Sequence, residues 1–309
     1  MEEYDVVVVG GGPGGLTAGM MASLRGLKVL VLDGGAFGGL LVSLYPKKLI
    51  LNYPGFAEGI AARELGEAWV RQAQGYGVVM KRERVVEITP ELLVRTTEGE
   101  YLGRATVIAT GNRPRELGIP GEMDFNYQDR GVHYYVTEPQ AFQGKRALVV
   151  GGGDTALDAA LDLLGVASEV YIAHRRESFR ALEASIEKAK AGGAKFLLET
   201  ELEAILGGEG VERALLKGKE GRFELHVDAV VLAVGQVPNT EIYQKLGLET
   251  DQEGRIVTDR EQRTSVKGVF AVGDVVTGTG ALELILVAAS QGAVAAHHIY
   301  MDLSQPYWG

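Results

Sequence analysis

Two glycine-rich turns in the sequence have the residue types and spacing to hold a phosphorylated nucleotide. One is GGGPGG at residues 10–15, and the other is GGGDTA at residues 151–156, 141 positions further on. In such a turn the first glycine permits a tight bend and the second lets the backbone approach a pyrophosphate, which the amides at the start of the next helix bind. The predicted contacts are Gly10, Gly12, Pro13 and Gly14 in the first turn and Gly151, Gly153, Asp154 and Thr155 in the second.

The two units differ at the position 23 residues after the first glycine of each turn. In the first unit this residue is Asp33, which is placed to accept hydrogen bonds from a ribose diol. The second unit has a basic group at the same offset, namely His174, Arg175, Arg176 and Arg180. A carboxylate would repel a 2'-phosphate, whereas arginines bind it by charge-assisted hydrogen bonds. The first site therefore suits FAD or NAD, and the second suits NADPH.

No side-chain group with a direct chemical role accompanies these turns. The sequence contains no cysteine, which excludes disulfides, thiolate metal sites and redox steps through a protein thiol. The five histidines show no spacing typical of a shared metal, and no Ser/His/Asp set is recognisable. Hydride transfer between a nicotinamide and a flavin depends on positioning rather than on acid–base residues. We therefore predict no catalytic side chain and no metal.

Each turn needs a strand before it and a helix after it. The valine-rich stretch 4–10, an apolar-periodic stretch 16–24 and a second strand 28–33 supply these elements for the first turn. The pattern returns as strand 146–150, helix 156–164 and strand 169–173. Two such units predict an α/β fold with two doubly wound, Rossmann-like dinucleotide-binding domains.

The second of these domains is expected to be inserted into the first. Prolines at 114 and 120 precede the second unit, and GQVPN at 235–239 follows its last predicted strand, so both stretches are hinge candidates. Residues 268–274 (GVFAVGD) read as a further buried strand that completes the first sheet. The predicted domains are residues 1–113 with 239–309 for FAD, and residues 114–238 for NADPH.

Composition limits the class of protein and its partners. The chain has 309 residues, 46% of them hydrophobic, and a formal net charge of -10, which argues against general binding to nucleic acid or anionic membranes. The acidic N-terminus lacks the features of a secretory signal. The most apolar stretch, 281–296, is interrupted by polar residues and is too short for a membrane span. A cytoplasmic protein is expected.

The chain resembles the thioredoxin-reductase-like flavoproteins over nearly its whole length. The matching stretches are GGGPGG, NYPGF at 52–56, ATGN at 109–112, IPG at 119–121, GGGDTALDAAL with HRRxxxR at 174–180, and TSxxGVFAVGD at 264–274. The resemblance implies that the outer segments bind FAD, that the inserted domain binds NADPH, and that the protein is a homodimer.

The redox CxxC of true thioredoxin reductases is absent from the region before the second glycine turn. The chain is therefore more similar to the thioredoxin-reductase-type ferredoxin–NADP reductases, whose GGQLxxLYPxK stretch resembles GGLLVSLYPKK at 38–48. This resemblance implies that Tyr45 stacks on the isoalloxazine, although core packing is the alternative for that side chain. It also implies that Val86 contacts the adenine through its backbone and that Asp274 binds the ribityl chain. Further implied cofactor contacts are Gly39, Leu40, Asn52, Thr110, Gly111, Gly273 and Ile285.

Two departures from the resemblance concern the flavin. Leu40 stands where the family has a glutamine that contacts the flavin, and the tail after Tyr300 is shorter than the family's flavin-covering tail. Tyr307 or Trp308 could cover the flavin instead, or could be an exposed terminal aromatic without a role.

These observations lead to one principal hypothesis and two alternatives. NADPH would reduce FAD after rotation of the inserted domain, and electrons would pass singly to a ferredoxin or flavodoxin. A docking surface could include basic side chains of one segment, namely Lys47, Lys48, Arg63, Arg71, Arg82 and Arg84. The alternatives are a related enzyme that uses oxygen, a quinone or another acceptor, and a flavin-bound redox sensor or scaffold that does not turn over.

Overall fold

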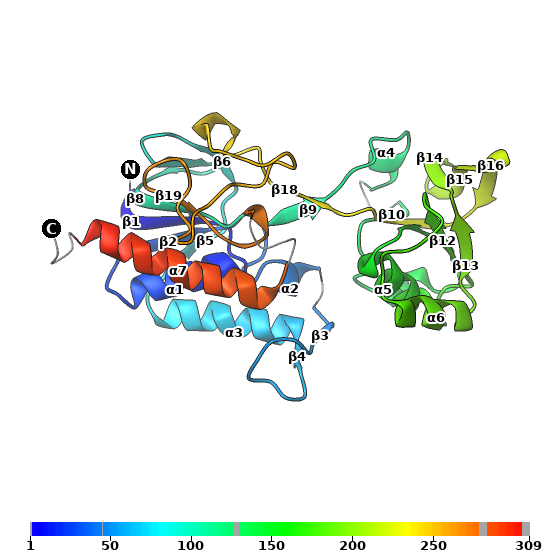
Figure 1. Cartoon of the computed structure of the whole chain (residues 1–309), viewed down its shortest axis with the longest axis horizontal. Coiled ribbons are helices and arrows are strands. Elements are labelled where there is room, and N and C mark those ends of the chain that lie inside the picture. Colours follow the sequence, from blue (N-terminus) through cyan, green and yellow to red (C-terminus); the bar gives the residue numbers. More distant parts are fainter. Residues whose placement is uncertain (1, 45, 127–129, 278–282, 305–309) are drawn as a thin grey trace. The chain divides into compact units, whose positions relative to one another are not determined.

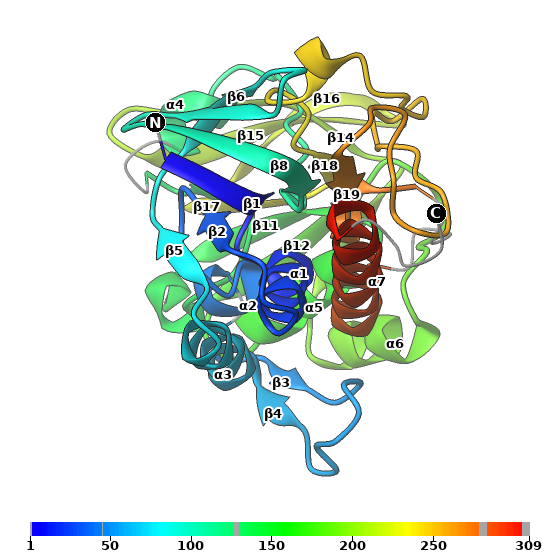
Figure 2. The same ribbon diagram turned by 90° about the vertical axis from the view of Figure 1, so that its left-hand side faces the viewer.

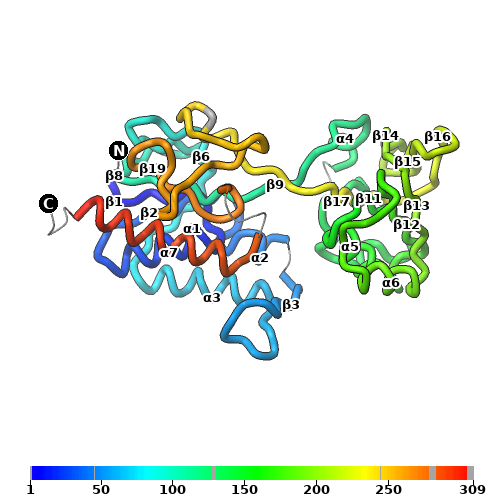
Figure 3. Tube along the Cα trace, viewed as in Figure 1, coloured from blue at the N-terminus to red at the C-terminus, as the bar shows by residue number. Residues whose placement is uncertain are grey.

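The computed structural model describes residues 2–44, 46–126, 130–277 and 283–304. The chain divides into two compact units: unit 1 comprises Met1–Arg113 and Val237–Gly309, and unit 2 comprises Pro114–Gln236. The chain passes from unit 1 to unit 2 at β9 (Asn112–Pro114) and returns at β18 (Gln236–Pro238), and these two strands pair with each other (Figure 3).

A seven-stranded sheet lies at the centre of unit 1, in the order β5-β2-β1-β8-β7-β6, with β19 also paired to β8. Its strands are β1 (Glu2–Val9), β2 (Val29–Leu32), β5 (Val79–Lys81), β6 (Val85–Ile88), β7 (Leu93–Thr96), β8 (Glu100–Ile108) and β19 (Val269–Ala271). β5, β2, β1, β8 and β19 are parallel, whereas β6 and β7 are antiparallel. The pairing of β19 with β8 confirms that the C-terminal segment completes the first sheet.

Side chains that alternate along β1 fill two cores. Val6 and Val8 pack with helices α1 (Pro13–Ser23), α3 (Ala62–Gly75) and α7 (Ile285–Leu303), which lie on one side of the sheet (Figure 2). Val7 and Val9 pack on the other face with β6, β7 and the segment 242–256. Among the described helices, none is long and apolar enough to cross a membrane.

Unit 1 also contains short elements, namely α2 (Leu40–Ser43), the antiparallel pair β3 (Leu49–Ile50) and β4 (Ile60–Ala61), and the 3-10 helices η3 (Gln244–Leu246) and η4 (Gly273–Val275). Of these, α2 and η4 include predicted contacts.

Unit 2, which contains helices α5 (Asp154–Leu163) and α6 (Glu183–Ala191) as Figure 1 shows, is built on a five-stranded parallel sheet in the order β10-β17-β11-β12-β13. Its strands are β10 (Val132–His133), β11 (Arg146–Gly151), β12 (Glu169–His174), β13 (Lys195–Leu198) and β17 (Ala229–Ala233). Helices α5 and α6 share a core with one face. The antiparallel strands β14 (Glu201–Gly207), β15 (Val211–Gly218) and β16 (Gly221–His226) belong to the other side, with α4 (Glu122–Asn126), while η2 (Pro139–Phe142) packs on the α5 side.

Both helices that follow the glycine turns begin earlier than the sequence pattern predicts. α1 begins at Pro13 rather than Leu16, and α5 begins at Asp154 rather than Ala156. The glycines before them, Gly12 and Gly153, have extended backbones and occupy the N-cap positions. Proline suits the first helical position because its missing N–H would have no partner there. The apolar pattern starts later than either helix because α1 begins with a proline and two glycines, which carry no large apolar side chain, and α5 begins with the exposed polar residues Asp154 and Thr155.

Candidate nucleotide-binding sites

The first glycine turn is held tightly against its own sheet. Gly10 has a φ of +111°, and a Cβ added to it would overlap the carbonyl oxygen of Ala109 in the next strand. A Cβ on Gly15 would in turn overlap the carbonyl oxygen of Gly10. These two glycines are therefore required by the packing of strand, turn and helix.

Gly12 differs, because the described part of the chain does not require a glycine there. Its φ of -79° and ψ of -174° suit any residue, and among the described residues, its two chain neighbours aside, no atom lies within 4 Å of an added Cβ. Gly153 at the start of α5 repeats this feature, with φ -104°, ψ -179° and open space around an added Cβ. In both units, open space therefore adjoins the amides at a helix N-terminus, which fits a pyrophosphate.

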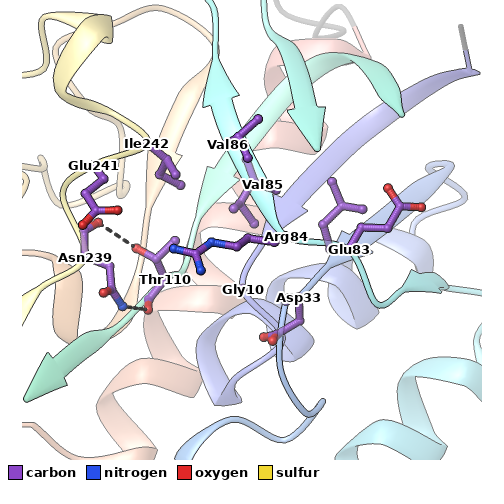
Figure 4. A pocket seen from close by; sticks show the side chains of 13 residues that line it. Gly10, Asp33, Glu83, Arg84, Val85, Val86, Thr110, Asn239, Glu241 and Ile242 are labelled. Atoms are coloured by element: carbon purple, nitrogen blue, oxygen red, sulfur yellow. Dashed lines mark hydrogen bonds between the residues drawn. The ribbon is translucent and has the colours of Figure 1, made fainter. Parts of the chain in front are cut away.

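A cavity of about 510 Å³ adjoins the first turn (Figure 4). Its lining includes four residues predicted from the sequence, namely Gly10, Asp33, Val86 and Thr110. The carboxylate of Asp33 accepts hydrogen bonds from the N–H of Gly11 at 2.6 Å and of Gly35 at 2.7 Å. Asp33 thus fixes the turn and remains at the cavity wall, where a ribose diol would fit.

The cavity wall also contains Asn239, Glu241 and Ile242, which the sequence did not single out. The Asn239 side-chain N–H donates to the carbonyl of Thr110 at 2.9 Å, and its backbone N–H donates to the carbonyl of Gly111 at 3.2 Å. Asn239 therefore joins the returning chain to the end of β8. The sequence signal for this role of Asn239 is its position directly after a proline in a predicted hinge, because a polar side chain there can bind backbone groups of the adjacent connection.

Asp274 lies in η4 at the end of β19, with its carboxyl largely buried. Burial, followed by the nearby carboxylate of Glu283, raises the pKa of Asp274 to about 6, while Arg255 acts in the opposite direction. The N–H of the preceding Gly273, whose φ is +81°, donates to the side-chain oxygen of Gln291 at 2.7 Å. Among the described residues this carboxyl has no ion-pair partner, and it therefore suits the hydroxyl donors of a bound polyol.

The Asp274→Asn variant is expected to unfold less readily than the wild-type chain at pH 8 when both are free of flavin. The folded-state pKa of about 6 lies above the ordinary 3.8, so the ionised carboxyl destabilises the fold above pH 6. The free energy of unfolding of the variant should exceed that of the wild type by about 3 kcal/mol at pH 8. This difference should shrink as the pH falls from 6 and vanish below about pH 4. Urea unfolding at several pH values measures it; a pH-independent difference would contradict burial of the charge.

Further predicted contacts in unit 1 are Gly39, Leu40, Ile285 and Asn52. A Cβ on Gly39, whose φ is +61°, would lie 2.9 Å from the Cα of Gly12, so the stretch that leads into α2 packs against the turn. Leu40 is the first residue of α2, and Ile285 packs beside Leu41 and Ile50. Asn52 is exposed. Tyr45, Tyr307 and Trp308 lie outside the described residues.

In unit 2, the side chain of His174 packs against the second glycine turn. Its ring is buried and stacks on Phe179 with ring centroids 5.0 Å apart, and Nε2 lies 3.1 Å from the carbonyl oxygen of Ser178. A Cβ on Gly152 would overlap the ring. Burial lowers the pKa of His174, and Arg176, Arg175 and Arg180 lower it further. The ring is thus neutral at pH 7 and positions the turn.

The arginines after His174 are exposed near the open space at Gly153. Arg175, Arg176 and Arg180 form no ion pair with any residue that the structure describes. The backbone N–H of Arg180 donates to the carbonyl of Gly152 at 2.8 Å. The carboxylate of Asp154 accepts from the N–H of Leu182 at 3.0 Å, which joins the start of α5 to the same segment. These hydrogen bonds hold the segment that carries the arginines next to the glycine turn, as a 2'-phosphate site requires.

A comparison with protein families matches residues 4–292 to the model for the pyridine nucleotide-disulphide oxidoreductases. The chain belongs to the pyridine nucleotide-disulphide oxidoreductase family. It is accordingly an oxidoreductase. Because the sequence contains no cysteine, this member of the family has no redox disulfide of its own.

Characterised relatives of this oxidoreductase align over almost its full length. Its alignment with a ferredoxin–NADP reductase of Metallosphaera sedula has 38% identity over 312 residues. This alignment covers 96% of this chain and 92% of the relative. The chain is 37% identical to a thioredoxin reductase of Treponema pallidum, with 98% and 99% of the two chains covered. Among solved structures, Lactococcus lactis thioredoxin reductase in its FR conformation matches with a TM-score of 0.88 and 33% identity, over 98% of this chain and 100% of that one. The resemblance and the α/β fold predicted from the sequence are thereby confirmed.

Proposed function

We propose that the protein is a FAD-dependent oxidoreductase that takes electrons from NADPH and delivers them to a ferredoxin or flavodoxin. The observation that carries this proposal is the repeated open space at Gly12 and Gly153, followed by an acid in one unit and by arginines in the other. The relatives named ferredoxin–NADP reductase support the same reaction.

FAD belongs to unit 1 in this proposal. The amides at the start of α1 bind its pyrophosphate beside Gly12, and Asp33 accepts hydrogen bonds from the adenosine ribose. Asp274 accepts from hydroxyls of the ribityl chain. When bound, FAD accepts a hydride and can release electrons one at a time.

NADPH belongs to unit 2. The amides at the start of α5 bind its pyrophosphate beside Gly153, and Arg175, Arg176 and Arg180 bind the 2'-phosphate through charge-assisted hydrogen bonds. His174 keeps the turn in place without adding charge near pH 7. The chain's contribution to the reaction is therefore to bind and orient two nucleotides, since no side chain of the sequence is assigned to move a proton or form a covalent bond.

The acceptor is proposed to be a one-electron carrier protein. Without cysteines, electrons cannot leave through a dithiol, so they must leave from the cofactor itself. Exposed basic side chains before α3, along α3 and directly after β5 could guide an acidic carrier despite the net charge of -10, namely Lys47, Lys48, Arg63, Arg71 and Arg82. Arg84 is withdrawn from this set because it lines the cavity of unit 1.

An acceptor comparison tests this proposal directly. With NADPH as donor, turnover should be fast when ferredoxin passes electrons on to cytochrome c and slow when oxygen or a quinone is the sole acceptor. The second candidate, an enzyme that uses oxygen or a quinone, is favoured by Leu40, which cannot supply the hydrogen bond of the family's glutamine. Peroxide formation that matches NADPH consumption, with no stimulation by ferredoxin, would favour that candidate instead.

The assembly and location of the protein are further proposals. We propose a homodimer, on the resemblance to the thioredoxin-reductase-like flavoproteins, and light scattering of the purified protein would give the mass. Cytoplasmic location stays a prediction from the sequence.

A further inference from the structure

Arg84 occupies a position in unit 1 that neither the glycine turns nor the family resemblance assigns. It directly precedes β6 and lines the cavity beside Asp33 and Gly34. A Cβ added to Gly34 would lie 3.1 Å from the Cβ of Arg84. The side chain of Arg84 therefore begins next to Gly34, the residue that follows Asp33, whose carboxylate is proposed to bind the ribose.

From this starting point the side chain reaches across the cavity. Figure 4 shows Arg84 extending from the β6 side toward Thr110 on the opposite wall. Within the part of the chain that the structure describes, Arg84 forms no ion pair. Its guanidinium is thus available to a ligand in the cavity.

The other charged side chains of the cavity lining are all acids, namely Asp33, Glu83 and Glu241. Glu83 is buried and already accepts hydrogen bonds from the hydroxyl of Tyr101 at 2.7 and 2.9 Å and from that of Thr96 at 2.6 Å. These hydrogen bonds of Glu83 fix the backbone of the neighbouring Arg84. Arg84 is the one cationic residue among these lining residues.

Arg84 and Val86 both line the cavity and are both exposed, whereas Val85 between them is buried in the core. Under the proposed function, the adenine lies by the backbone of Val86 and the ribose by Asp33. Arg84 lies between these two contacts, over the place that the adenosine would take.

We propose that Arg84 covers the adenosine half of FAD by stacking its guanidinium on the adenine ring. This inference rests on the proposed binding of FAD in unit 1. A planar guanidinium stacks on an aromatic ring and gains cation–π attraction, whereas the compact ammonium of lysine lacks the flat face. Arg84 then acts as a positioning residue that slows the loss of FAD and favours FAD over FMN, which has no adenine.

The experiment measures how fast FAD leaves the holoenzyme, from the rise in flavin fluorescence after dilution, in wild type, Arg84→Met, Arg84→Lys and Arg82→Met. Arg82 is a matched control because it is an exposed arginine two residues earlier and does not line the cavity. Both Arg84 variants should lose FAD about tenfold faster, and Arg82→Met should match wild type. Binding of FMN to the full-length chain freed of flavin should be the same in all four proteins.

Three results would overturn the inference. Wild-type release from Arg84→Met would mean that Arg84 does not contact the cofactor, and wild-type release from Arg84→Lys would mean that charge alone matters. An equal loss of FMN binding would indicate a general distortion of the site. Purified wild-type protein that holds no FAD at all would instead contradict the proposed function, which separates the two failures.

Discussion

A Gly12→Val variant is expected to fold normally and to be purified without flavin. The backbone at Gly12 is extended and suits valine, and within the part of the chain that the structure describes no atom beyond the two neighbouring residues lies within 4 Å of the added Cβ. The new methyl groups would instead occupy the space where the pyrophosphate meets the amides of α1. Overlap costs about 1–3 kcal/mol and each lost hydrogen bond to a charged phosphate a similar amount, so FAD binding should weaken roughly 1000-fold. The flavin absorbance per chain and the melting temperature measure both effects.

Gly153→Val is the matched control for this experiment. It places the same side chain at the equivalent position of the second turn, where the surroundings are also open. This variant should keep its FAD and lose reduction by NADPH. Loss of FAD in Gly153→Val, or full FAD content in Gly12→Val, would contradict the assignment of the two nucleotides to the two units.

The Arg175→Gln, Arg176→Gln double variant is expected to raise the KM for NADPH at least about 100-fold and to change the KM for NADH less than about threefold. Each arginine contributes a charge-assisted hydrogen bond to the 2'-phosphate worth about 1.5–3 kcal/mol, and NADH lacks this group. Both side chains are exposed, so their replacement should leave the fold intact. Steady-state kinetics with each nucleotide and a common acceptor measure the effect.

Arg213→Gln provides the control for loss of positive charge in unit 2. Arg213 lies on β15 and pairs with Glu224 at 2.6 Å, away from the glycine turn in the sequence. Its KM values for both nucleotides should equal those of the wild type. An equal rise for NADPH and NADH in the double variant would show that the arginines do not recognise the 2'-phosphate.

Much of the fold was predictable because its signals are local. The valines of β1 and the repeated glycine turns predicted the parallel strands of both sheets, and the run at 268–274 predicted that the C-terminal segment completes the first sheet. The helix starts were misplaced because apolar periodicity detects only large apolar side chains, and α1 begins with a proline and two glycines while α5 begins with the exposed polar residues Asp154 and Thr155.

The cavity wall was less predictable because it joins residues that are far apart in the chain. Asn239 meets Thr110 across 129 positions, and no local pattern records that contact. Arg84 reads as an exposed charge in a basic run, and only the pairing of the strands brings it beside Asp33. His174 shares its offset with Asp33, yet its ring is buried against Gly152, which the offset alone did not predict.

Anaerobic rapid mixing with NADPH tests the central claim most directly. The flavin absorbance of the purified holoenzyme should bleach rapidly with NADPH and more slowly with NADH at the same concentration. Addition of oxidised ferredoxin should then restore the oxidised spectrum within the time of one turnover, whereas oxidised thioredoxin should not. A flavin that NADPH does not bleach, or a reduced flavin that ferredoxin does not reoxidise, would contradict the account.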